Sequence, residues 1–129
     1  MATVLVVDDE QVVLRLAESI LSSAGYRVVP VCGAAAALRV AARGSESIDI
    51  VLADVVMPGT SGPTCVDQLV AMDRSLAVIL MSEFGIPAMR KYADGRGFHF
   101  VSKPLEPSDL TQVLELALAA RIVLEEVSA

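Results

Sequence analysis

Five polar side chains come directly after apolar, strand-like runs of the sequence. They are Asp8 and Asp9 after the first run, Asp54 after the third, Ser82 after the fourth and Lys103 after the fifth. Taken singly, each is an ordinary turn or capping residue. Together they would place three carboxylates, a hydroxyl and an ammonium group at one edge of a sheet, which is where open parallel sheets form their sites.

This set of groups suits the chemistry of phosphate. Clustered carboxylates raise one another's pKa unless a cation compensates them, and Mg²⁺ prefers such oxygen ligands with retained waters. A cation at Asp9 and Asp54 could hold an incoming phosphoryl group, and a carboxylate can attack it to form an acyl phosphate. Lys103 would pair with the added charge and Ser82 would donate to a phosphoryl oxygen. The residues therefore predict transient capture of phosphate.

The elements that position these groups alternate between strands and helices. Apolar runs predict strands at residues 3–7, 26–31, 48–53, 76–81 and 98–102. Helical spacing predicts helices at 13–24, 34–42, about 61–72 and from 107 onward, and the Gly- and Pro-rich segment 83–97 predicts a fourth helix that is short or irregular. Pro30 cannot donate to a strand ladder, so the second strand belongs at a sheet edge. This alternation indicates an α/β fold with a parallel sheet and helices on both faces.

Length and composition exclude several classes of protein. A chain of 129 residues indicates one domain, which we expect to occupy 1–121, with 122–129 as the end of the last helix and a tail. Every apolar stretch is shorter than the ~20 residues of a membrane span. A net charge of −6 argues against a general nucleic-acid binder. We expect Cys32 and Cys65 to be buried free thiols in a reducing cytoplasm.

Four short motifs resemble those of one known family. They are Val-Asp-Asp-Glu at 7–10, Asp-Val-Val-Met-Pro-Gly at 54–59 with Ser-Gly at 61–62, Met-Ser at 81–82 and Lys-Pro at 103–104. In order and approximate spacing they resemble the receiver domain of bacterial two-component response regulators. The resemblance implies a flavodoxin-like α/β/α fold with a five-stranded parallel sheet in the order 2-1-3-4-5.

The resemblance also assigns roles to residues. It implies that Asp54 is the phosphoacceptor and that Ser82 and Lys103 are the switch hydroxyl and the lysine that contact phosphate. The implied Mg²⁺ ligands are Asp8, Asp9, Asp54 and the backbone carbonyl of Val56. The Lys103–Pro104 bond is usually cis in the family.

Several positions are open to more than one interpretation. Phe100 is either the aromatic switch of the family or a plain core residue. Glu83 stands where the family commonly has Ala or Gly, and its carboxylate would oppose a phosphoryl group unless it points to solvent. Val56 and Phe84, at the two positions that influence hydrolysis in the family, are apolar and would instead exclude water and lengthen the phosphorylated lifetime. The sequence does not rank these opposing effects.

The implied activity is that of a signalling module rather than of an enzyme, although such a module assists its own phosphorylation and dephosphorylation. Its partners would be a histidine kinase or histidine phosphotransfer protein and a downstream protein, with no direct DNA binding and a cytoplasmic location. The segment leading to Lys103 looks most like receivers fused behind hybrid histidine kinases, so the chain could be a module of a longer one. Residues 122–124 could mediate homodimerisation or could cover the domain's own core.

Two alternatives have different chemistry. A degenerate receiver would act as an interaction module independent of phosphorylation, and Glu83 keeps this alternative open. A flavin mononucleotide-binding protein would share the fold but needs a Gly-, Ser- or Thr-rich phosphate cradle after the first strand. The acidic residues 8–10 occupy that place instead.

Overall fold

The computed structural model describes residues 1–83 and 87–128, which form alternating strands and helices. In chain order the elements are β1 (Thr3–Asp8), α1 (Gln11–Ser23), β2 (Arg27–Cys32), α2 (Ala34–Arg43), β3 (Ile50–Asp54), α3 (Gly62–Met72), β4 (Ala77–Ser82), α4 (Pro87–Gly95), β5 (His99–Ser102) and α5 (Pro107–Ser128). Each predicted strand and helix is present, with ends displaced by a few residues.

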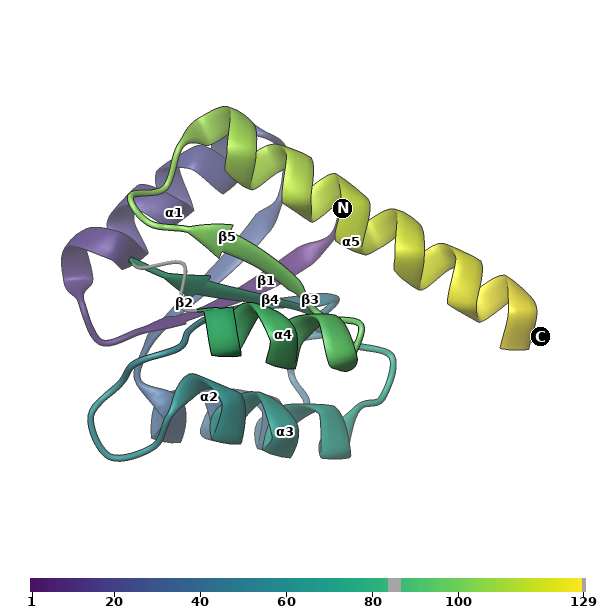
Figure 1. Ribbon diagram of the computed structural model, residues 1–129, viewed down its shortest axis with the longest axis horizontal. Helices are drawn as coiled ribbons and strands as arrows, with labels where there is room; N and C mark the ends of the chain where they lie inside the picture. Colours follow the sequence, from purple (N-terminus) through teal and green to yellow (C-terminus); the bar gives the residue numbers. More distant parts are fainter. Residues whose placement is uncertain (84–86, 129) are drawn as a thin grey trace.

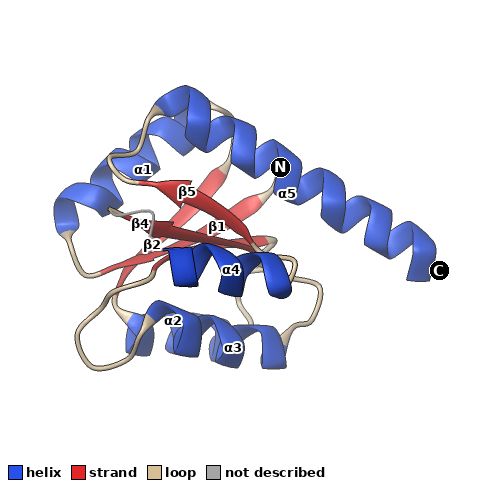
Figure 2. Ribbon diagram, in the orientation of Figure 1, coloured by secondary structure: helices blue, strands red, loops and turns tan. Residues whose placement is uncertain are grey.

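The strands form a parallel sheet in the order β2-β1-β3-β4-β5 within the described residues. The sheet lies between two layers of helices, with α1 and α5 on one face and α2, α3 and α4 on the other (Figure 1, Figure 2). The chain reverses its direction of travel across the sheet between β2 and β3, so the crevice at this point opens beside β1 and β3. The flavodoxin-like fold and its strand order are confirmed.

Strand β2 lies at one edge of the sheet, as Pro30 predicts. It pairs with β1 alone, and Pro30 stands opposite Val6 in the register. Because an edge strand has a neighbour on one side only, the missing N–H of proline need not interrupt a second ladder.

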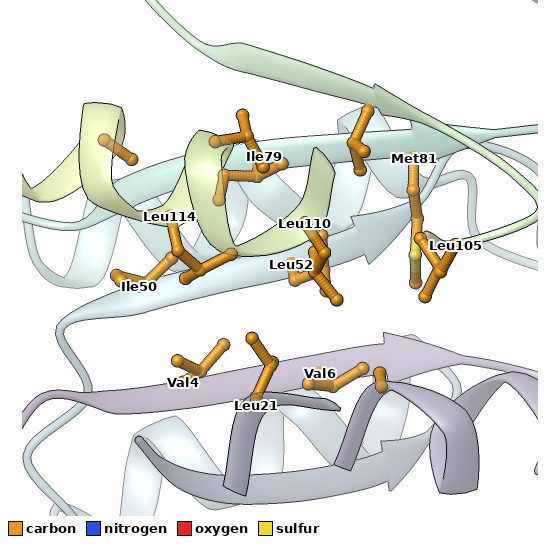
Figure 3. Close-up of a cluster of buried hydrophobic side chains, with 14 of the residues drawn as sticks. Val4, Val6, Leu21, Ile50, Leu52, Ile79, Met81, Leu105, Leu110 and Leu114 are labelled. Atoms are coloured by element: carbon orange, nitrogen blue, oxygen red, sulfur yellow. The ribbon is translucent and has the colours of Figure 1, made fainter. Parts of the chain in front are cut away.

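The central strands are buried on both faces, which explains their unbroken apolar sequences. All residues of β1 and β3 are buried. Alternate side chains enter two separate cores: Val4 and Val6 pack with α1 and α5, whereas Leu5 and Val7 pack with α2 and α3. Figure 3 shows the first of these cores, where side chains of β1, β3 and β4 meet those of α1 and α5.

Helix α4 is a regular helix of nine residues, Pro87–Gly95, and is the shortest of the helices described. The sequence predicts a fourth helix that is short or irregular, and this is confirmed because the helix is short. The preceding residues 84–86 lie outside the described part of the chain, and the prediction for Phe84 falls on them.

The prediction of two buried free thiols is confirmed for Cys65 and wrong for the burial of Cys32. Both thiols are free and Cys65 is buried, but Cys32 is exposed. Cys32 is the last residue of the edge strand β2, where coverage by neighbouring elements ends. Among residues 1–83 and 87–128, no helix combines the length and the apolar character needed to cross a membrane.

Helix α5 offers a direct test of the core, because it carries a buried and an exposed leucine two residues apart. Leu114 is fully buried in the first core and Leu116 is 56% exposed. We expect Leu114→Ala to lower the free energy of unfolding by about 2–5 kcal/mol, since it removes buried methyl groups and leaves a cavity. Leu116→Ala should change it by less than about 0.5 kcal/mol. Urea unfolding of both variants checks this, and equal effects would contradict the packing described.

Candidate functional site

The polar residues singled out in the sequence converge at the carboxyl edge of the sheet. Asp8 ends β1, Asp54 ends β3, Ser82 ends β4 and Lys103 follows β5. All four are buried. Burying ionisable groups is unfavourable unless they are paired, so this arrangement needs compensating contacts.

The ammonium group of Lys103 supplies that compensation. Its Nζ donates to Oδ2 of Asp8 at 2.8 Å and lies 3.5 Å from Oδ1 of Asp54. The backbone N–H of Lys103 donates to the carbonyl of Ser82 at 2.8 Å, which extends the β4–β5 ladder to the site. The following bond, Lys103–Pro104, is cis, as the sequence resemblance implied.

Backbone groups orient the two buried carboxylates. Oδ1 of Asp54 accepts a hydrogen bond from the N–H of Val56 at 3.4 Å, and Oδ1 of Asp8 accepts one from the N–H of Glu10 at 2.9 Å. Lys103 and Val56 therefore contact the same oxygen of Asp54. Among the described residues no hydrogen bond to Oδ2 of Asp54 is found.

The pKa of Asp54 lies above its ordinary value. Burial of the carboxyl group is the main cause and the neighbouring charge of Asp8 adds to it, while Lys103 and the Val56 N–H act in the opposite direction. Burial by itself would lower the pKa of Lys103, but its hydrogen bond and charge interaction with Asp8 and its proximity to Asp54 raise that pKa overall. Lys103 is thus held as a cation.

Three neighbouring carboxylates could hold a metal ion. One oxygen each from Asp8, Asp9 and Glu10 lies within 4.8 Å of the others, with Asp8 buried and the other two exposed. The donors are all carboxylate oxygens, which fits a hard cation such as Mg²⁺. Glu10 lies outside the ligand set predicted from the sequence, although it follows the acidic pair directly.

Among the described residues, Asp54 is linked to the cluster of Asp8, Asp9 and Glu10 through Lys103, whose ammonium group contacts both Asp54 and Asp8. The side chain of Val56 is 67% exposed, and the contact of this residue with the site is through its backbone N–H.

Glycine 62 is a further residue that the sequence analysis did not single out as functional. It begins α3, and its N–H donates to the carbonyl of Val55 at 3.1 Å. A Cβ atom at this position would lie 1.9 Å from the backbone oxygen of Asp54 and 2.9 Å from Cα of Val55. Only glycine allows α3 to start this close to the strand end that carries Asp54.

Phe100 is half-buried on β5 and packs against the second core. The guanidinium carbon of Arg90, on α4, lies 5.5 Å from the centre of its ring, within the range of a cation–π contact. The structure thus gives Phe100 a packing role together with a specific contact to α4.

A hollow of about 420 Å³ lies beside the site. It is lined by Val12, Val13, Leu16, Glu83, Lys103, Pro104 and Leu105. A larger hollow, about 470 Å³, lies at the other end of β4 and β5, and none of the predicted site residues lines it. The hollow beside Lys103 is therefore the one relevant to the site.

Comparison with known proteins agrees with the fold. The family model described as the response regulator receiver domain matches residues 4–115. The chain therefore belongs to the family of response regulator receiver domains, the signalling domains of two-component systems.

Individual relatives show the same domain in different settings. The two-component response regulator ARR14 of Arabidopsis thaliana is 29% identical over 124 residues, which cover 95% of this chain and 32% of that protein. The sensor kinase CckA of Brucella abortus is 32% identical over 116 residues, which cover 88% of this chain and 12% of that protein. The chain thus spans less than a third of the length of these relatives.

A solved structure matches the chain over nearly its whole length. The crystal structure of a response regulator receiver domain protein from Clostridium thermocellum has a TM-score of 0.87 and 26% sequence identity, and the match covers 96% of this chain and 99% of that one. The receiver domain of the hybrid histidine kinase CckA matches with a TM-score of 0.76 and 26% identity, over 91% of this chain and 99% of that one.

The close approach at Gly62 can be tested by adding one methyl group. We expect Gly62→Ala to lower the free energy of unfolding by roughly 1–3 kcal/mol, because the new Cβ meets backbone atoms that cannot rotate away. Gly95→Ala is the matched control, since nothing lies within 4 Å of a Cβ there. It should leave stability unchanged or raise it by up to about 1 kcal/mol. Urea unfolding measures both, and a neutral Gly62→Ala would argue against this packing.

The raised pKa of Asp54 predicts a pH-dependent stability. The folded state binds the Asp54 proton more tightly than the unfolded state, so this stabilisation is present below the ordinary pKa of 3.8 and is lost as pH rises through the raised folded-state pKa. Asp54→Asn should therefore be more stable than wild type at pH 7 in EDTA, and the difference should shrink as pH falls toward 3.8.

Unfolding curves across this pH range check the prediction, with Asp94→Asn, an exposed position, as the control. A variant less stable than wild type at pH 7 would show that Lys103 outweighs burial at Asp54.

Proposed function

We propose that the chain accepts a phosphoryl group on Asp54 from the phosphohistidine of a histidine kinase or histidine phosphotransfer protein, and that it signals through a protein surface. One observation carries this proposal. A buried carboxylate with a raised pKa has one oxygen held by Lys103 and Val56, while the described residues form no hydrogen bond to the other. Membership of the receiver family supports it.

The acidic residues at the end of β1 would hold Mg²⁺. We assign Asp8, Asp9, Asp54 and the carbonyl of Val56 as its ligands, with Glu10 close enough to contribute directly or through water. When bound, the ion would neutralise charge that develops on the phosphoryl oxygens.

The remaining steps belong to residues of the chain. Burial makes the Asp54 carboxylate more basic, and Lys103 keeps Oδ1 in place so that Oδ2 faces the donor. A bond forms between Oδ2 and phosphorus while the bond from phosphorus to the histidine nitrogen breaks, and the electron pair returns to the imidazole. Lys103 then pairs with the new phosphoryl oxygens, and the Ser82 hydroxyl donates to one of them.

The signal would pass from this edge to β5 and α4. Movement of Ser82 and Lys103 toward the phosphoryl group would shift the ends of β4 and β5, and Phe100 lies two residues before the end of β5. We assign Phe100 as the aromatic switch, with its ring contact to Arg90 linking β5 to α4. Phosphorylation adds about −1.5 to −2 charges, enough to shift such a two-state equilibrium.

The surface around the hollow fits a protein donor. Val12 and Leu16 of α1 are 75% and 42% exposed, and both line the hollow that reaches Lys103. Exposed apolar side chains beside a reactive carboxylate suit docking of an amphipathic helix that presents its phosphohistidine. We place the donor contact on this surface. We further propose that residues 1–121 form the receiver module and that it acts in the cytoplasm, where kinases use ATP.

Phosphorylation can be tested with a small donor. Acetyl phosphate with Mg²⁺ should add one phosphoryl group to the wild-type chain, measured by intact mass. Asp54→Asn should abolish the gain and EDTA should prevent it, whereas Asp94→Asn, an exposed position on α4, should behave as wild type.

A modification that persists in Asp54→Asn would contradict the assignment of the acceptor. If the wild type shows neither a mass gain nor a spectral response to beryllofluoride, the chain is the phosphorylation-independent interaction module considered above.

A further inference from the structure

Two charged residues line the hollow beside the site. They are Lys103 and Glu83, and the other residues of the lining are apolar. Lys103 is the residue that contacts Asp54, and Glu83 follows the buried Ser82 directly. Glu83 therefore lies on the rim of the space next to the reacting groups.

Among the described residues, Glu83 lacks the compensating cation that the buried Asp8 and Asp54 have. Asp8 and Asp54 share the Lys103 ammonium group, whereas the exposed Glu83 forms no ion pair or hydrogen bond within residues 1–83 and 87–128. A carboxylate on the rim of the hollow acts electrostatically on any ion that enters it. Because a phosphoryl donor is an anion, this charge opposes its entry.

We propose that Glu83 is a specificity-determining residue that selects phosphoryl donors by charge. It disfavours small, multiply charged phosphate donors and favours a protein donor that brings a basic side chain to the rim of the hollow beside its phosphohistidine. This inference rests on the proposed function, since it concerns the donor to Asp54. The carboxylate repels small, multiply charged donors. This repulsion discriminates between donors without requiring an additional contact with the protein donor.

Two small phosphoryl donors that differ in net charge can distinguish an effect of the Glu83 charge from an effect of its shape. Acetyl phosphate is a dianion at neutral pH and releases acetate when the oxygen–phosphorus bond breaks. Phosphoramidate carries one negative charge less and releases ammonia when its nitrogen–phosphorus bond breaks, and both place the phosphoryl group on Asp54. For a carboxylate several ångströms away in high dielectric, one unit of donor charge changes the rate by roughly threefold.

The experiment compares phosphorylation rates of wild type, Glu83→Gln and Glu83→Lys with each donor. We expect Glu83→Gln to raise the acetyl phosphate rate about threefold to tenfold and the phosphoramidate rate less, so that the ratio of the two rates rises about threefold. Glu83→Lys should raise this ratio further. Both gains should vanish near 1 M salt, where the screening length is about 3 Å.

Glu18→Gln is the matched control, because it removes the same charge from an exposed position on α1 that does not line this hollow. It should leave the ratio unchanged. Equal gains with both donors, or gains that persist in high salt, would show that Glu83 acts by shape and would overturn the charge filter.

The outcome also separates this inference from the proposed function. If every form is phosphorylated on Asp54 with the same donor ratio, the proposed function stands and the role of Glu83 is wrong. If neither donor phosphorylates the wild type or the variants, both are wrong. Phosphorylation of the Glu83 variants alone would support both, since the acceptor would then be intact behind the filter.

Discussion

The structure depends on one buried cation held between two buried carboxylates. Lys103 contacts Asp8 at 2.8 Å and Asp54 at 3.5 Å, and these groups come from the ends of β1 and β3 and from the loop after β5. A buried charge without its partner destabilises a fold by several kcal/mol, so Lys103 and Asp8 require each other, whereas Lys103 offsets the burial of Asp54 only in part. The polar groups at this edge of the sheet therefore depend on one another. A phosphoryl group on Asp54 would compete with Asp8 for the ammonium group of Lys103.

This arrangement explains why the proposed acceptor is both stable and reactive. Four acids, Asp8, Asp9, Glu10 and Asp54, and one lysine give this edge an excess of negative charge, which a divalent cation would relieve. The same excess makes the site unfavourable for a free anion, and Glu83 adds to it from the rim of the hollow. Under the proposed function, access to Asp54 would thus depend on positive charge brought by the metal ion and by the donor.

Much of the site could be predicted because parallel strands bring their carboxyl ends to one edge. Asp54 and Lys103 are distant in sequence, yet each is the first strongly polar group after an apolar strand, and this alone places them together. Gly62 escaped prediction because its constraint is a backbone approach between α3 and β3, which no local pattern records. Cys32 was placed wrongly because an apolar neighbourhood in sequence does not show where the edge strand loses its cover.

The sheet divides the interior into two cores that share no side chain among the residues described. Packing under α1 and α5 is separated by the backbone of the strands from packing under α2, α3 and α4. Substitutions that reshape the α4 side leave the α1 side in place, because additivity holds for sites without shared partners. If the donor docks on the α1 side as proposed, the α4 side can therefore change to suit a different downstream protein without altering the packing that supports the donor surface.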